Sequence, residues 1–148
     1  MAHFAELESK TDPTGFTSDT HLVVKRVVVV ANDVVPSDEH ADGETWCVNF
    51  FGGGTWKQTS YNNNFRKQYA GKDMVYNASK NKFLAVQPFA SWSLDDSDDW
   101  EAPVTYPNKD VTDYDISWDE DNTRWLGTKE SDDSEHRWNA DNKSWVAL

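Results

Sequence analysis

One short pattern occurs three times in this chain of 148 residues and limits what the chain can fold into. In each copy an aromatic residue is followed by Asp or Asn, and a second aromatic residue comes seven positions after the first. The copies are Tyr76/Asn77/Phe83, Trp118/Asp119/Trp125 and Trp138/Asn139/Trp145. An Asp or Asn at this place can accept hydrogen bonds from the backbone of its own turn. The pattern therefore predicts three tight β-hairpins, and the pair Trp92 and Trp100 is a looser fourth copy.

The length of the hairpin loop decides whether the two aromatic residues meet. If the loop holds four residues, they lie directly opposite each other on neighbouring strands, where such a pair contributes about 0.5–1 kcal/mol. We expect Asn122 and Asn142 in these loops to adopt the left-handed backbone conformation, because Asn tolerates it. An isolated hairpin is only marginally stable in water. The hairpins must therefore share a sheet or pack on another chain.

The rest of the chain predicts a mainly β protein, with an antiparallel sheet built from hairpins and one short α-helix. Residues 3–8 alternate between apolar and polar and predict a strand. The valine-rich residues 22–31 predict a second strand, buried on both faces in its C-terminal half. We expect these two strands to pair as an antiparallel hairpin with residues 9–20 as its loop. Residues 44–51 predict the helix, which Gly52 ends.

Charge is unevenly distributed along the chain, and we predict two domains. Residues 1–110 form a β-rich core, and residues 111–148 form an acidic pair of aromatic hairpins. Residues 95–148 carry sixteen acidic side chains against five Lys and Arg, which is −11 of the total net charge of −12. Because DNA binding rests on the neutralisation of phosphates, this charge argues against a nucleic-acid partner. Residues 22–31 are too short and too charged to span a membrane. The N-terminus carries acidic residues where a signal peptide would carry basic residues and an apolar run. We therefore expect synthesis in the cytoplasm and no membrane contact.

No sequence pattern is typical of an enzyme or a metal site. The four histidines are scattered, and Cys47 lies on the apolar face of the predicted helix. The glycines at 52–54 lack the following Lys and Ser or Thr of a phosphate-binding loop. Counted from Asp95, the acidic run has Trp100 and Tyr106 where a calcium-binding loop needs Gly and Glu. We therefore expect no catalytic residue, no metal and no cofactor.

Two segments resemble a known family. GGGTWKQTSYNNNFRKQYAG at residues 52–71 and QPFASW at residues 87–92 are similar to segments of small proteins from marine tailed phages, including cyanophages. In that family a start like MAHFAEL leads into a valine-rich strand, a short helix that ends in Gly, and terminal aromatic hairpins. The resemblance covers nearly the whole chain and implies a phage context. This chain departs from the family in a longer loop at residues 9–20 and in a second terminal hairpin.

The resemblance and the absence of an enzyme pattern imply a non-enzymatic virion structural protein. We expect a capsid decoration or cement protein, present as a homo-oligomer or in many copies on the outer shell, and bound to the major capsid protein or another virion protein. The edge of the strand at residues 3–8, or an aromatic hairpin, would make the contact. The residues expected at the contact are Trp118, Trp125, Trp138 and Trp145, followed by Trp56, Tyr61 and Arg66. Phe89 and Trp92 are expected in the core.

Other functions fit the same sequence. The protein could be a component of the tail or tail fibre that touches the host surface, or a chaperone of tail-fibre assembly. Aromatic hairpins also suggest a glycan-binding module, because exposed aromatic rings stack on the faces of sugars. Copy number in the virion separates these functions: decoration requires hundreds of copies, a tail component a few, and a chaperone none.

Overall fold

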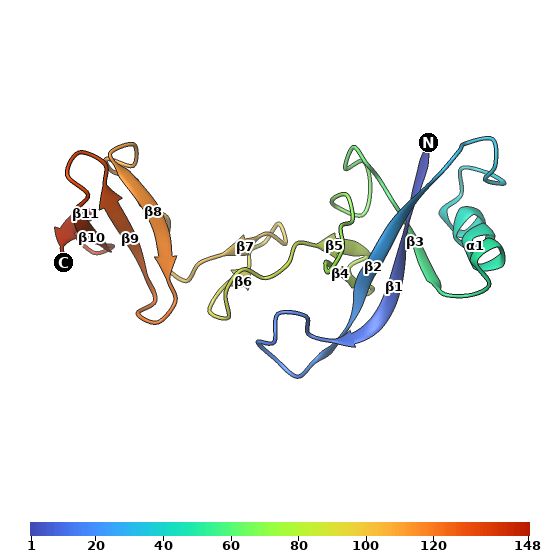
Figure 1. Ribbon diagram of the computed structural model, residues 1–148, viewed down its shortest axis with the longest axis horizontal. Coiled ribbons are helices and arrows are strands. Elements are labelled where there is room, and N and C mark those ends of the chain that lie inside the picture. The colour runs from blue at the N-terminus through green and yellow to red at the C-terminus, as the bar shows by residue number, and fades with distance from the viewer. The chain divides into compact units, whose positions relative to one another are not determined.

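A computed structural model describes residues 1–148, and the chain forms two compact units, Met1–Val86 and Gln87–Leu148 (Figure 1). The strands make up 39% of the chain and the single helix 8%, and the antiparallel sheets are built from hairpins. These proportions confirm the predicted fold class. The units divide earlier in the chain than the boundary expected after residue 110. The reason is that Phe89, Trp92 and Val104 pack against the tryptophans of the C-terminal hairpins.

The N-terminal unit contains a five-stranded sheet with the strand order β3-β1-β2-β4-β5. Its strands are β1 (Ala2–Thr11), β2 (Thr20–Val30), β3 (Thr55–Thr59), β4 (Val75–Asn77) and β5 (Lys82–Leu84). Strands β1 and β2 form the predicted hairpin, with a connection shorter than the expected loop at residues 9–20. The Asp12 carboxylate accepts backbone N–H groups of Thr14 and Thr17 at 2.9 and 3.2 Å, which confines the reversal to residues 12–19.

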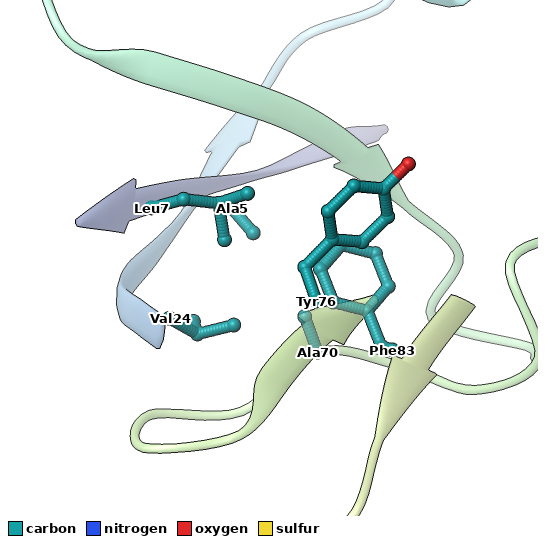
Figure 2. Packing of buried hydrophobic residues seen from close by; sticks show 6 residues of the cluster. All are labelled: Ala5, Leu7, Val24, Ala70, Tyr76 and Phe83. Atoms are coloured by element: carbon teal, nitrogen blue, oxygen red, sulfur yellow. The ribbon is translucent and has the colours of Figure 1, made fainter. Parts of the chain in front are cut away.

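Strand β1 lies between β2 and β3, so residues 3–8 are not at an edge of the sheet, contrary to the prediction. Its successive side chains enter two different apolar clusters, because neighbouring residues of a strand point to opposite faces. Figure 2 shows the first cluster, in which side chains from β1, β2, β4 and β5 converge. Its buried members are Ala5, Leu7, Val24, Ala70, Tyr76 and Phe83. The second cluster, on which the helix packs, contains Ala2, Phe4, Val30, Cys47 and Trp56.

The strand buried on both faces is therefore β1, and the prediction that the C-terminal half of β2 has this property is wrong. Val29 of β2 is 55% exposed. The reason lies in the neighbours of each strand: β1 has a strand on both sides, whereas the end of β2 has a strand only on the β1 side.

The helix α1 (His40–Phe51) begins before the predicted start at residue 44 and ends, as predicted, at Gly52, whose φ of 75° is left-handed. Gly43 explains why the sequence did not predict the first turn of α1. Glycine disfavours a helix, yet a Cβ at Gly43 would lie 2.5 Å from Cζ of Phe4. Only glycine at this position lets the helix approach the sheet so closely.

The C-terminal unit contains a four-stranded sheet with the order β11-β10-β9-β8 and a separate pair, β6 and β7. The bounds are β6 (Ser93–Leu94), β7 (Trp100–Glu101), β8 (Tyr114–Asp119), β9 (Arg124–Lys129), β10 (Glu135–Asn139) and β11 (Ser144–Ala147). The sheet is a meander of the two terminal hairpins, which lie side by side. In the looser fourth copy, Leu94 rather than Trp92 is opposite Trp100.

The three repeated hairpins have the predicted geometry. Trp118 is opposite Trp125, Trp138 is opposite Trp145, and Tyr76 is opposite Phe83, with four-residue loops between the paired strands. The left-handed residue is the last of each loop rather than Asn122 or Asn142: Asn81, Thr123 and Lys143 have φ of 52°, 52° and 50°. In the last hairpin the Asn139 side chain accepts the N–H of Asn142 at 3.1 Å. This bond holds Asn142 within the turn, and the next residue, Lys143, adopts the left-handed conformation instead.

The tryptophans of the two terminal hairpins form one core. Trp118, Trp125 and Trp138 are buried together, and Phe89 and Trp92 pack against them as expected. Trp145 stacks on Tyr114 with a centroid distance of 4.4 Å. Gly127 makes this stacking possible, because a Cβ there would lie 2.7 Å from Cζ3 of Trp145. A glycine inside a strand often marks such a close approach.

Candidate functional site

On the outer edge of β3, the backbone of Gln58 is bonded to side chains of the same unit. The N–H of Gln58 donates to Oε2 of Glu44 in α1 at 3.0 Å. The C=O of the same residue accepts Nη1–H of Arg66 at 2.9 Å. Both backbone groups of Gln58 are therefore used within the unit, and a strand from another molecule cannot pair with them.

On the outer edge of β5, the backbone of Phe83 is bonded to residues 66 and 68 of the same unit. The N–H of Phe83 donates to the C=O of Arg66 at 3.1 Å, and the C=O of Phe83 accepts Nε2–H of Gln68 at 3.1 Å. Arg66 thus closes one edge with its side chain and another with its backbone. Its side chain is only 8% exposed, so the structure gives this predicted contact residue an internal role.

Within the sheet of the N-terminal unit, the end of β2 also has an unpaired side. Strand β4 pairs with β2 only through Leu22 and Val23, and Val24 then exchanges backbone hydrogen bonds with Asp73 and Met74 at 2.9 and 2.8 Å. From residue 25 to residue 30, β2 has a strand neighbour only on the β1 side. We call residues 25–30 the open edge. Its alternate N–H and C=O groups can accept one further strand, which is how many proteins bind extended peptides.

Two cations stand at the beginning of the open edge. Lys25 is the extra residue of a β-bulge, since Glu6 pairs with Arg26 and Leu7 with Val24. Both cations lie near the Glu6 carboxylate, and the Arg26 guanidinium also lies over the Phe51 ring, 4.7 Å from its centroid. A bulge and charges commonly restrict pairing at an edge. They leave residues 27–30 as the part that a partner strand can reach.

The tryptophans predicted to contact a partner are mostly buried. The exposed fractions are 3% for Trp56, 9% for Trp118, and 7% each for Trp125 and Trp138. Trp145 is half-buried and donates Nε1–H to the C=O of Lys109 at 3.0 Å. Tyr61 alone of the predicted set is widely exposed, at 66%, and stacks on His3. The buried tryptophans therefore stabilise the fold and offer little surface to a partner.

The C-terminal unit carries two hollows that share residues 103–106 in their lining. One has a volume of about 410 Å³ and the other about 450 Å³. The first is lined by Trp92, Trp100 and Trp125, the second by Asn108, Trp138 and Lys143, and Tyr106 belongs to both. We call the two hollows together the aromatic groove. No pattern in the sequence places these residues together, because they come from separate hairpins and a connecting segment.

Glu120 connects two parts of the C-terminal unit. Its carboxylate accepts Nε1–H of Trp118 at 2.7 Å, Oγ–H of Ser91 at 2.8 Å and the backbone N–H of Ser91 at 2.9 Å. The bond from Trp118, followed by those from Ser91, lowers the pKa of the carboxyl group below its ordinary value of 4.5. The ionised form of Glu120 thus holds the segment before β6 against the turn between β8 and β9.

Acid should loosen the C-terminal unit through Glu120. Because its pKa is lower in the folded state, the carboxylate stabilises the fold above the ordinary pKa of 4.5, and this stabilisation is lost as the pH falls through the lower folded value. We expect the melting temperature of Glu120→Gln to fall less than that of the wild type when the pH is lowered below about 4.5, as measured by tryptophan fluorescence. Asp121→Asn, in the same turn and exposed, is the control and should retain the wild-type profile. Identical profiles for wild type and E120Q would contradict this role.

The thiol of Cys47 lies inside the N-terminal unit. Cys47 is fully buried, and burial, with a smaller effect of Glu44, raises the pKa of its thiol to about 11. A protonated thiol is a poor nucleophile. No group of three or more His, Cys, Asp or Glu is placed to hold a metal ion. The single helix is neither long nor apolar enough to cross a membrane.

Comparisons with models of protein families, with curated proteins and with solved structures find no match.

Proposed function

We propose that the protein is a non-enzymatic structural protein of a tailed-phage virion and that it decorates the outer shell of the capsid. The observation that supports this most directly is the open edge at residues 25–30 of β2, in a sheet whose outer strands have Gln58 and Phe83 already hydrogen-bonded on their outer sides within the unit. A sheet in which part of one strand has no neighbour on one side can receive a strand from a partner there. The phage context rests on the resemblance of residues 52–71 and 87–92.

The contact would form by strand addition. An extended segment of the major capsid protein pairs with residues 27–30, and its side chains pack beside Val29, which is 55% exposed. Main-chain hydrogen bonds supply affinity, and the side chains on alternate faces supply specificity. The bulge at Lys25 limits the register of the added strand. Residues 95–148, with their net charge of −11, favour solubility of the decorated particle.

Copy number in the virion tests the location. Peptide mass spectrometry of gradient-purified, salt-washed virions would give the number of copies of this chain per major capsid protein. A ratio near one, or a simple fraction of one, supports decoration of the shell. A handful of copies contradicts decoration and supports a tail component, and absence from the particle contradicts both.

A substitution on the open edge tests the contact. Val29→Lys places a charge where the added strand would pack, and we expect binding to virions that lack the protein to weaken by about tenfold. Val34→Lys is the matched control, because Val34 is also exposed, at 46%, and lies outside the sheet. Circular dichroism would verify that both variants are folded. Equal binding of the two variants would rule out the open edge as the contact.

A second function is favoured by the aromatic groove. A component of the tail or tail fibre that touches the host surface needs a site for surface molecules, and the groove has the aromatic lining for one. The chaperone of tail-fibre assembly has no comparable observation in its favour. A chaperone would be abundant in the infected lysate and missing from the particle.

A further inference from the structure

We infer that the aromatic groove of the C-terminal unit binds a neutral oligosaccharide of at least two sugar units. This inference does not depend on the proposed place of the protein in the virion, because it concerns only residues 87–148.

The first support is the arrangement of the rings. Tyr106 is 53% exposed, yet its ring meets buried Trp125 edge-on at a centroid distance of 5.0 Å. Trp92 meets the same tryptophan at 6.0 Å. An exposed ring held by a buried one keeps a fixed orientation. The negative face of such a ring attracts the polarised C–H groups on the face of a sugar.

The second support is the polar groups beside these rings. Glu101 and Thr105 line the first hollow, and Asn108 and Lys143 line the second. Together they offer hydrogen-bond donors and acceptors to hydroxyl groups.

The third support is the division into two hollows of similar size. Their volumes, about 410 and 450 Å³, both fall in the range of about 300–1,000 Å³ for small-molecule sites. Because the hollows share residues 103–106, a ligand made of repeated units can occupy both. The net charge of −11 in residues 95–148 disfavours sugars that carry carboxylate or sulfate groups. A neutral oligosaccharide satisfies all of these conditions.

The test is a titration of the full chain with neutral oligosaccharides. The probes are glucans with α- and β-linkages, chitin fragments and mannans, each from the monosaccharide to the hexasaccharide, with tryptophan fluorescence and calorimetry as readouts. We expect at least one series to bind, with affinity that rises from the monosaccharide and levels off once both hollows are filled. Absence of binding by every series would overturn the inference, as would affinity that does not depend on length.

Two variants connect the binding to the groove. Tyr106→Ala removes the ring shared by the hollows and should weaken binding at least about tenfold, whereas Tyr106→Phe should retain most of it. Tyr61→Ala is the matched control, because this tyrosine is also exposed but belongs to the N-terminal unit. Equal affinity of Y106A and Y61A would overturn the assignment to the groove. Preference for tetramethylammonium over every neutral sugar would also overturn it and would indicate a cation-binding aromatic cage.

Discussion

Replacing Arg66 by methionine should destabilise the N-terminal unit by about 3 kcal/mol. The guanidinium donates to Oε2 of Glu44 at 3.1 Å, to the C=O of Gln58 at 2.9 Å and to Oδ1 of Asn81 at 2.9 Å. Its removal leaves the carboxylate of Glu44, a side chain only 13% exposed, without its closest cation. It also frees the backbone C=O of Gln58 and opens the edge of β3. We therefore expect Arg66→Met to self-associate as well as to lose stability.

Urea unfolding would measure the loss of stability, and light scattering would measure the association. Lys57→Met is the control, because Nζ of Lys57 lies 3.8 Å from the other oxygen of the same carboxylate and its side chain is 34% exposed. A partly exposed pair of this kind contributes roughly 0–1 kcal/mol. If the two variants lose the same stability, then Arg66 has no special role in closing the sheet.

Trp138→Ala should destabilise the C-terminal unit by about 4 kcal/mol, as much as Trp118→Ala. The two tryptophans come from different hairpins, but both are buried in one cluster with Trp125. Removal of either indole leaves a cavity between the hairpins, and the remaining rings lose contacts on that side. The second terminal hairpin, which the resemblance treats as an addition, would then be an integral part of the fold.

Thermal and urea unfolding of both variants would check this expectation. Tyr106→Ala serves as the control, because its ring is 53% exposed and its loss should change stability by less than about 1 kcal/mol. A loss below that level for Trp138→Ala, with a normal loss for Trp118→Ala, would show that the last hairpin is only attached to the unit.

The repeated hairpins could be predicted because everything that determines them is local. The spacing of the aromatic residues, together with a four-residue loop, sets the register of Trp118 opposite Trp125 and of Trp138 opposite Trp145. The end of the helix at Gly52 is equally local. Each of these features depends on residues within one turn or one pair of strands, where composition and spacing carry the information.

The features that the sequence did not reveal depend on distant neighbours. Strand β1 is internal because His3 pairs with Thr59, far away in the chain. The first turn of α1 needs Gly43 for the sake of Phe4, in another element. Trp118 and Trp138 are buried because the two terminal hairpins share one core, and neither hairpin alone indicates this. The open edge also depends on where β4 stops, which only the assembled sheet shows.

The meander of the C-terminal unit has a consequence for how such a chain can grow. Each hairpin sets its own register through a local turn, and β10 joins the sheet along the free side of β9. Strand β11 offers its own outer side for the same kind of pairing. A further copy of the aromatic pattern joined after residue 148 would extend the sheet by two strands without disturbing the existing pairs. The unit is thus extensible in whole hairpins, and duplication of a segment of about twenty residues suffices for each step.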